Sequence, residues 1–320
     1  MNLMKMAVRG LAALALLLSS LPAAYAACAS SPGSADFGTL NSFVAGSTAQ
    51  TVMASSGFKC SGGLLTLLST NTVTATIASS ANGVGTQPDM IGPNNVKLPY
   101  QICPDSACGT VLNIGNQTTW SSTTLLGLLG LFNAADGSLP VYLRTATGVN
   151  LPAGTYNDTL TINWTYHICF IGVLGLCAYT DGADSTVISV KMVVTNACFI
   201  DNAPNVSFGS AAFPAGFASV TGNTLSIRCT LSASYTVNLA STVPVNGQYR
   251  QMSSTNNGVT SYLQYQIFKG DASVWTAATN TSLLGTGTAQ TVGYTATINP
   301  SQPNPPAGNY SDTVLVTVSY

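Results

Sequence analysis

The chain contains one sequence pattern twice, in the same order. Each copy begins with a cysteine, continues with a Phe-Gly pair, a second cysteine and a Leu-x-Tyr segment, and ends on Ala-Gly-x-Tyr-x-Asp-Thr. The first copy consists of Cys28, Asp36-Phe37-Gly38, Cys60, Leu98-Pro99-Tyr100 and Pro152 to Thr159; the second consists of Cys198, Ser207-Phe208-Gly209, Cys229, Leu263-Gln264-Tyr265 and Pro306 to Thr313. A repeated order of this kind indicates two copies of one folding unit. We therefore expect two tandem domains, at residues 27–195 and 198–320.

The strand that closes each copy indicates the fold class. After the Ala-Gly-x-Tyr turn, apolar residues occupy every second position: Leu160, Ile162, Trp164 and Tyr166 in the first copy, and Val314, Val316, Val318 and Tyr320 in the second. Such alternation is typical of a strand with one face on a core. Further β-branched runs lie between turn residues, at Thr72 to Ile77, Leu225 to Arg228, Thr236 to Leu239 and Thr291 to Ile298. We predict an all-β protein made of two antiparallel sandwiches.

The N-terminal residues predict export. Lys5 and Arg9 precede an apolar run, and Ala24-Tyr25-Ala26 is typical of a signal-peptidase site. We expect a signal peptide at residues 1–26, and a mature chain that is secreted through the periplasm to the cell surface. A lipoprotein anchor at Cys28 is the alternative, although Tyr25 fits such a signal poorly and the repeat gives Cys28 another role.

The chain has too few charged residues for a nucleic-acid-binding protein or a helical fold. The 320 residues include 9 Lys or Arg, 10 Asp and no Glu. A nucleic-acid-binding protein needs a basic stripe that neutralises phosphates, and the sequence offers none. Surface helices also rely on Glu, Lys and Arg, so the composition argues against a helical fold as well.

The chain has 8 cysteines, all beyond the predicted signal peptide. In an oxidising compartment we expect them to form disulfides. Their equivalent places in the repeat favour Cys28–Cys60 and Cys198–Cys229, one bond in each domain. The other cysteines occur only in the first domain and favour two short loops, Cys103–Cys108 and Cys169–Cys177. Metal ligation by Cys103 and Cys108 is an alternative, but a second ligand pair is lacking.

Catalytic groups are scarce. His167 is the only histidine, and it falls on the polar face of its predicted strand, where a solvated side chain is the usual finding. Asp158 and Asp312 occupy equivalent turn positions, in which carboxylates typically cap backbone amides. We expect no catalytic residues, no metal and no cofactor. A secreted enzyme on a β scaffold is the weakest of the functional alternatives.

The repeated motifs resemble the spore coat protein U domain family. The resemblance covers the second domain almost completely and the scaffold positions of the first. Domains of this family are the pilins of archaic, Csu-type chaperone–usher pili, and two of them behind one signal peptide resemble the tip adhesin. The resemblance implies an incomplete immunoglobulin-like fold. It also implies three partners: a periplasmic chaperone that first supplies the missing strand, an outer-membrane usher, and the next pilin subunit, which donates the final strand.

The two domains differ in the strand that would complete them. In the second domain nothing follows the predicted strand from Asp312 to Tyr320, so we expect an open edge for polymerisation. In the first domain Thr186 to Thr195 adds a strand that can close the fold from within the chain. Its apolar stripe consists of Ile188, Val190, Met192 and Val194. Because Cys28 follows the cleavage site closely, we expect no donor strand at the N-terminus, which favours a position at the end of a fibre.

Two Gly-punctuated apolar segments occur only in the first domain. They are Leu125-Leu126-Gly127-Leu128-Leu129-Gly130-Leu131-Phe132 and Phe170-Ile171-Gly172-Val173-Leu174-Gly175-Leu176. Glycine disfavours strands and helices, so we expect loops, the second at the tip of a hairpin and clasped by Cys169 and Cys177. Exposed apolar loops commonly bind a partner. With the resemblance, they predict attachment to a hydrophobic or host surface and biofilm formation. The alternatives are that a segment packs into the core, or that the protein is a structural pilin or coat subunit without a ligand.

Overall fold

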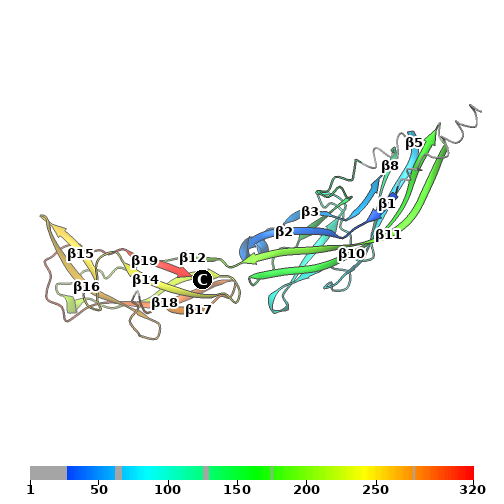
Figure 1. The fold of residues 1–320 in the computed structure, drawn as a ribbon. Coiled ribbons are helices and arrows are strands. Elements are labelled where there is room, and N and C mark those ends of the chain that lie inside the picture. Colours follow the sequence, from blue (N-terminus) through cyan, green and yellow to red (C-terminus); the bar gives the residue numbers. More distant parts are fainter. Residues whose placement is uncertain (1–26, 62–66, 125–129, 174–175, 277) are drawn as a thin grey trace, which may run out of the picture.

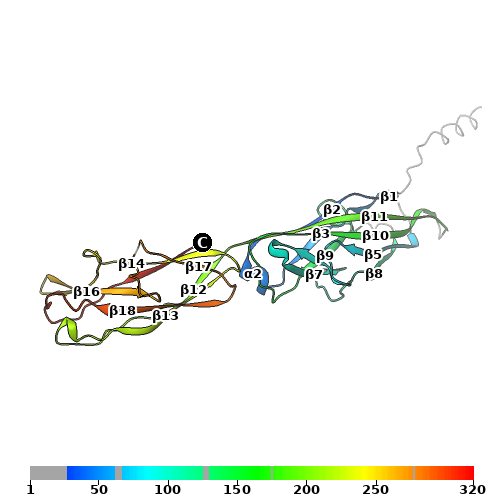
Figure 2. The ribbon, with the colours of Figure 1, turned by 90° about the horizontal axis from the view of Figure 1, so that it is seen from below.

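The computed structural model describes residues 27–61, 67–124, 130–173, 176–276 and 278–320. The chain forms two β domains joined end to end in an elongated molecule (Figures 1 and 2). The prediction of an all-β protein with two sandwich domains is confirmed. The predicted signal peptide lies outside the described residues. No helix within those residues has the length and apolar character needed to cross a membrane.

The first domain wraps its strands around a single core. Its elements are β1 (Ala27–Ser30), β2 (Gly33–Asn41), α2 (Ser42–Ser47), β3 (Thr51–Ser55), β4 (Phe58–Ser61), β5 (Leu67–Ser80), β6 (Asp89–Ile91), η1 (Pro93–Asn95), β7 (Lys97–Cys103), β8 (Gln117–Thr124), β9 (Pro140–Thr145), β10 (Gly154–Val173) and β11 (Leu176–Thr195). The strand order is β11-β2-β3-β9-β7-β6-β10-β5-β8, and β10 also pairs with β11. A separate ribbon joins β1 to β4. The extra β10–β11 pairing brings the sheet round on itself.

The longest feature of the first domain is the β10–β11 hairpin. Its two strands contain 20 residues each, and the register extends from Gly154 opposite Val194 to Val173 opposite Leu176. The predicted strand in its second arm is confirmed. The sequence predicted a loop over Phe170 to Leu176. This prediction is wrong in its extent, because pairing between the two strands continues through Gly172. Backbone hydrogen bonds across the hairpin outweigh the weak strand propensity of one glycine.

The second domain is a sandwich of two sheets. Its elements are β12 (Cys198–Asn202), η2 (Pro214–Gly216), β13 (Val220–Cys229), β14 (Ser234–Ser241), β15 (Arg250–Asn256), β16 (Val259–Lys269), β17 (Thr281–Leu284), β18 (Ala289–Ile298) and β19 (Val314–Ser319). One sheet has the order β12-β13-β18-β16-β15 and the other β17-β14-β19. The predicted final strand is present but shorter than expected. It spans Val314–Ser319, so Asp312 and Tyr320 lie outside it.

All four predicted disulfides are present: Cys28–Cys60, Cys103–Cys108, Cys169–Cys177 and Cys198–Cys229. The first and last occupy equivalent places, since each joins directly opposite residues of two paired strands. Each domain has its own apolar core, with Trp164 fully buried in the first and Trp275 in the second. The repeat in the sequence therefore corresponds to a repeat in covalent and core structure.

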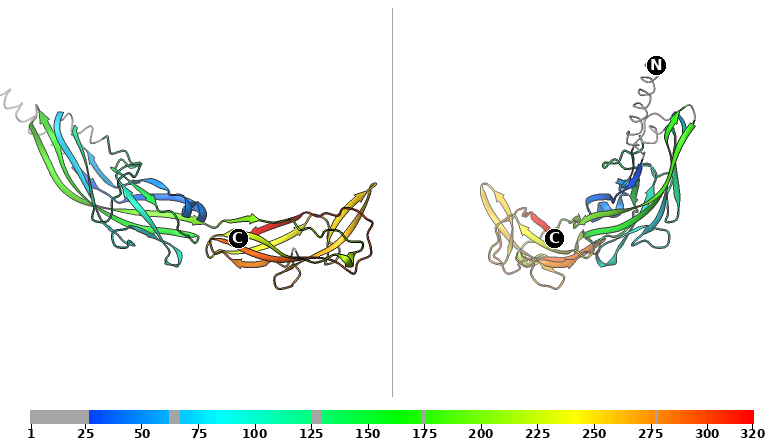
Figure 3. Two further views of the ribbon diagram at one scale, coloured as in Figure 1. Left: turned by 180° about the vertical axis from the view of Figure 1, so that it is seen from behind. Right: turned by 45° about the vertical axis from the view of Figure 1, so that its right-hand side comes forward.

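The domains meet where α2 contacts one end of the second domain (Figure 3). The hydroxyl oxygens of Ser42 and Thr230 lie 2.6 Å apart in a buried hydrogen bond. The ring of Phe43 packs edge-on against Phe199, with 5.3 Å between the centroids. The guanidinium of Arg228 lies 4.9 Å and 5.2 Å from the same two rings. We call this set of contacts the joint.

Candidate functional site

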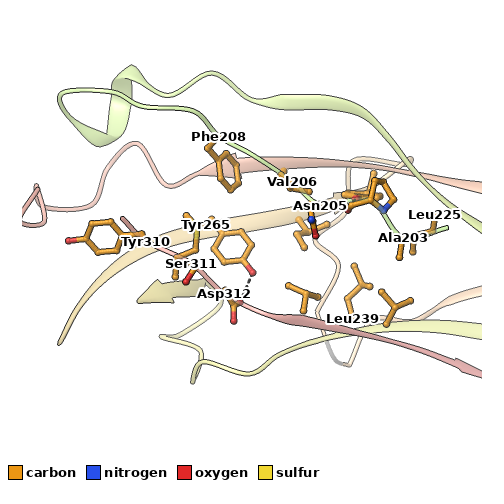
Figure 4. A pocket seen from close by; sticks show the side chains of 17 residues that line it. Ala203, Asn205, Val206, Phe208, Leu225, Leu239, Tyr265, Tyr310, Ser311 and Asp312 are labelled. Atoms are coloured by element: carbon orange, nitrogen blue, oxygen red, sulfur yellow. Dashed lines mark hydrogen bonds between the residues drawn. The ribbon is translucent and has the colours of Figure 1, made fainter. Parts of the chain in front are cut away.

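A groove runs beside the edge strand β19 in the second domain (Figure 4). Its volume is about 360 Å³. One wall is formed by Ala203 to Phe208, a segment that belongs to no sheet in the described chain. The other wall extends from Tyr310 to Val316. The floor is the domain core, formed by Leu225, Leu239, Met252, Tyr265, Ile267, Tyr294 and Ala296.

The wall formed by β19 is an open sheet edge. Among the described strands, β19 pairs with β14 alone. Its other edge therefore offers backbone N–H and C=O groups to an additional strand. A groove with an apolar floor and an unpaired backbone edge has the chemistry to bind an extended peptide.

In the first domain a strand of the chain itself occupies the equivalent place. There β11 lies between β10 and β2, antiparallel to the first and parallel to the second. Ile188, for example, lies opposite Leu160 on one side and Gly33 on the other. The repeat relates β10 to β19, and β2 to the groove wall from Ala203 to Phe208. The second domain thus has both flanking segments, and no described strand lies between them.

Equivalent side chains differ in burial accordingly. In the first domain Phe37 is 7% exposed and Tyr156 is fully buried. Their second-domain equivalents, Phe208 and Tyr310, are only half-buried. The closing strands show the same difference. Three residues of β10 are fully buried: Leu160, Ile162 and Trp164. Their equivalents in β19 are only half-buried: Val314, Val316 and Val318. The groove therefore exposes apolar surface that the first domain covers.

A tyrosine–carboxylate pair fixes the closing strand in both domains. The hydroxyl of Tyr265 donates to Asp312 Oδ2 at 2.6 Å, and the hydroxyl of Tyr100 donates to Asp158 Oδ2 at 2.6 Å. Burial and the neighbouring carboxylate raise the pKa of both tyrosines, so each remains a protonated donor. The pair in the second domain lies in the groove itself.

Each carboxylate also accepts a backbone N–H, as the sequence predicted. Asp158 Oδ1 accepts from Asn82 N at 3.0 Å, and Asp312 Oδ1 accepts from Val243 N at 3.3 Å. The tyrosine donors were not predicted. The recurrence of Leu-x-Tyr together with Tyr-x-Asp in both copies is the signal that could have identified them.

A second tyrosine in each copy fixes the turn before the closing strand. The hydroxyl of Tyr156 donates to the carbonyl of Pro152 at 2.9 Å, and that of Tyr310 donates to the carbonyl of Pro306 at 2.6 Å. Burial raises the pKa of Tyr156 to about 12. The Ala-Gly-x-Tyr turns are therefore equivalent, and the two domains differ in what lies beside the strand that follows.

The predicted polymerisation residues do not all face the groove. Val314 and Val316 line it, and Val318 packs against the core beyond it. Tyr320 lies outside β19 and is 59% exposed. Their role in polymerisation stays a prediction.

The end of the first domain farthest from the joint is formed in part by the outer ends of β10 and β11 (Figure 1). The predicted surface-binding residues fall into three groups. Those outside the described residues are Leu125, Leu126, Leu128, Leu129 and Leu174. Those in β10 and β11 are Phe170, Ile171, Val173 and Leu176; the last three have partners across the hairpin, and Phe170 lies at a shift in the strand register. Leu131 and Phe132 are half-buried against the core, with the Phe132 ring centroid 6.2 Å from that of Phe58. These contacts agree with the packing alternative, and the surface-binding role of the two residues stays a prediction.

His167 lies on an exposed face of the β10–β11 hairpin. Its Nδ1 is 2.5 Å from Asp181 Oδ1, and its ring stacks on Tyr179 with 4.0 Å between the centroids. Since these partners come from the opposite strand, the contacts tie the two arms of the hairpin together. Within the described part of the chain, no three or more His, Cys, Asp or Glu side chains gather where they could hold a metal ion.

A β-sandwich with an open groove beside its last strand defines a pilin-like class of domain. The sequence profile of the Spore Coat Protein U domain matches residues 13–163 and 184–317, and the chain belongs to this family.

Most of the chain is similar to a solved pilus protein. That structure is the CsuC–CsuE chaperone–tip adhesion subunit pre-assembly complex, from the archaic chaperone–usher Csu pili of Acinetobacter baumannii. The identity is 25% and the TM-score 0.60, over 92% of this chain and 100% of the other. The CupB6 tip adhesin from Pseudomonas aeruginosa aligns over 92% of this chain and 94% of its own, at 16% identity and with a TM-score of 0.37. No curated protein sequence matches.

Proposed function

We propose that the protein is the tip adhesin of an archaic chaperone–usher pilus. It is exported, receives a donated strand in its second domain, and presents its first domain at the cell surface. The observation that carries this proposal is the groove beside β19, whose equivalent in the first domain is filled by β11. The similarity to a tip adhesion subunit solved with its chaperone supports it.

The first domain specifies what the donated strand should look like. By analogy with β11, it lies antiparallel to β19 and parallel to the opposite wall, with an apolar residue at every second position. In β11, Met192 lies opposite Tyr156, Val190 opposite Asp158, and Ile188 opposite Leu160. The equivalent second-domain positions are Tyr310, Asp312 and Val314. A periplasmic chaperone would fill these sites first, and the next subunit would replace it at the outer-membrane usher.

A tip position is supported by the location of β1. Ala27 to Ser30 pair with β4, and the Cys28–Cys60 disulfide holds them there. If the signal peptide is cleaved as predicted, the first residues of the mature chain are part of the first domain and do not form a free donor strand. The alternative, a structural pilin within the shaft, requires such a strand. Immunogold label along the whole shaft would favour this alternative.

The far end of the first domain is the proposed attachment surface. The backbone of Val173 and Leu176 forms the last described pair of the β10–β11 hairpin, and a disulfide clasps its strands at Cys169 and Cys177. Apolar side chains at this end would bind hydrophobic or host surfaces, each contributing roughly 1.5–3 kcal/mol when buried. Such attachment would support biofilm formation.

A fused donor strand tests the groove. A short Gly-Ser turn and a copy of Thr186 to Thr195 are added after Tyr320. The control insert has Thr in place of the four residues of its apolar stripe, the copies of Ile188, Val190, Met192 and Val194. We expect the fused chain to be soluble, with a protease-resistant second domain that no longer requires the chaperone. The unfused chain and the control should aggregate or depend on the chaperone. A stable, unfused monomer in which both domains unfold cooperatively contradicts the proposal.

A loop variant tests the attachment surface. Phe170, Ile171 and Leu174 are replaced by Ser or Thr, and attachment to plastic is measured at equal piliation. We expect reduced attachment with normal fibres. Normal attachment with normal fibres would remove this segment from the site, whereas loss of fibres would indicate a folding role.

A further inference from the structure

The second domain carries a hairpin that extends beyond its own sandwich. β15 and β16 pair as far as Asn256 opposite Val259. β16 pairs with β18 only from Tyr265 to Lys269. Residues 259–262 of β16 therefore have no third described strand beside them. The outer part of the hairpin, residues 253–262, projects from the end of the domain opposite the joint (Figure 1). We call these residues the overhang.

The overhang is a well-formed structure with exposed apolar residues. Its turn is Asn257-Gly258, with φ values of 48° and 81° that suit a tight two-residue hairpin turn. Val259 is 67% exposed and Tyr262 is 44% exposed. None of its residues is charged. Because side chains alternate along a strand, Val259 continues the inward face that carries the buried Leu263.

The first domain lacks this feature at the equivalent place. Its corresponding strand, β6, has only three residues, and the following η1 turn folds back onto the closing motif. Gly92 is so close to the Tyr156 ring that a Cβ there would overlap it, and a Cβ at Gly154 would overlap Pro93. The domain whose groove is filled has a compact turn here, and the domain whose groove is open has a long hairpin.

The direction of β19 places the overhang where a donated strand would leave the groove. β19 runs from Val314, paired with Ser241, to Ser319, paired with Thr236. The segment before it lies beside the overhang, since Ser311 and Ser253 exchange backbone hydrogen bonds of 2.9 and 3.0 Å. A strand antiparallel to β19 therefore enters near the joint and exits at the overhang. The folded body of the donating subunit must follow at that exit.

The chain contains one such exit already. β11 closes the first domain and leads, through residues 196–197, into β12 of the second. At this exit the closed domain contacts the body that follows: α2 forms the joint, and Asn150 Nδ2 donates to the carbonyl of Thr286 at 2.8 Å. In this chain the first domain, which β11 closes, therefore contacts the folded domain that follows β11.

We propose that the overhang binds the folded body of the subunit that donates the strand. The inference rests on the proposed function and adds a second contact to it. Val259 on the inward face of β16 and Tyr262 on the opposite face supply apolar area on both sides of the hairpin. Neutral polar groups surround them, so the partner surface would be apolar and uncharged. This contact would set the orientation of the protein on the fibre, as the joint does within the chain.

Site-specific photocrosslinking in fibre-assembling cells tests the inference. The full chain carries p-benzoylphenylalanine at Val259, at Phe208 in the groove wall, or at the control position Leu284, which is 58% exposed on β17. We expect Val259 and Phe208 to capture the same fibre subunit and Leu284 to capture none. Capture from Phe208 alone, or of a different protein from Val259, overturns the inference. No capture from Phe208 in piliated cells contradicts the proposed function itself.

A paired substitution gives an independent measurement. With Val259 and Tyr262 both changed to Ser, we expect more loss of the protein from sheared fibres. The thermal midpoint of the donor-fused chain should remain unchanged, because both side chains lie outside the core. Equal retention of the variant and the unmodified protein on sheared fibres would overturn the inference.

Discussion

Tyr100→Phe and Tyr265→Phe remove the same hydroxyl from the two copies of one motif. In each domain the lost group donates a 2.6 Å hydrogen bond to a carboxylate at the start of the closing strand. The surroundings differ, because Asp158 is 4% exposed whereas Asp312 is half-buried and lines the open groove. The repeat therefore allows the effect of burial to be measured with the chemistry held constant.

The expected magnitudes follow from these surroundings. A hydrogen bond to a charged group contributes about 1.5–3 kcal/mol, and a buried acceptor that loses its donor retains the desolvation penalty. Asp158 would keep its bonds from Ser80 Oγ at 2.6 Å and Asn82 N at 3.0 Å. We expect Tyr100→Phe to lower the free energy of unfolding of the first domain by about 2–3 kcal/mol. Water can replace the donor at Asp312, so Tyr265→Phe should cost the second domain about 1 kcal/mol or less.

Because a donated strand would cover Asp312, the variants are compared in the unfused chain, kept dilute so that it does not aggregate. Urea unfolding followed by peptide-resolved hydrogen exchange assigns each loss to a domain. Tyr142→Phe is the control, since its hydroxyl makes only an exposed 3.6 Å contact with Met53 Sδ. This control should change stability by less than about 0.5 kcal/mol. Equal losses for the two motif variants, or a larger loss in the second domain, would refute the argument that burial of the carboxylate sets the cost.

Three further predictions concern the joint, a buried acid and the closing strand. Phe43→Ala removes a ring that packs in the joint, and should weaken the contact between the domains by about 1–2 kcal/mol. Small-angle X-ray scattering would detect this as a broader range of interdomain orientations. Val44→Ala on the same helix should leave the scattering unchanged. Burial raises the pKa of Asp89 above its ordinary value of 3.8, so the folded state binds this proton more tightly and stability falls as pH rises from 3.8 through the raised value. Asp89→Asn should therefore reduce that fall in urea unfolding curves measured across this pH range, and an unchanged curve would contradict the assignment. Met192→Ala empties a fully buried position of β11 and should cost the first domain about 2–4 kcal/mol in thermal unfolding, whereas Lys191→Ala on the exposed face should have little effect.

The sequence predicted those features that depend on local pattern and on the repeat. Period-two alternation located the closing strand of each domain and the stripe of β11, because one face of each strand lies on a core. The equivalent places of Cys28 and Cys198 identified two of the disulfides. The apolar wall of the groove could be inferred in the same way, by asking what covers Val314 and Val316 in the second copy.

Other features depend on contacts that are distant in sequence. The helix α2 spans only Ser42–Ser47, too short for a helical period, and it is stabilised by Asn41, whose side chain accepts from the N–H groups of Phe43 and Val44. The packing of Phe132 on Phe58 joins residues with no shared local pattern. The overhang could not be predicted either. The residue pattern of β16 does not reveal that its neighbour β18 pairs with it only from Tyr265 to Lys269.

The course of β11 has a mechanical consequence. This strand runs without a break from Leu176, near the far end of the first domain, to Thr195, next to the linker into the second. If the protein attaches as proposed, a pull between the surface and the fibre would load β11 along its length. Its backbone hydrogen bonds to β10 and β2 lie across that direction, so tension would shear many of them together instead of breaking them one after another. One continuous strand would thus receive the load, and its hydrogen bonds would share that load with β10 and β2 along the length of the domain.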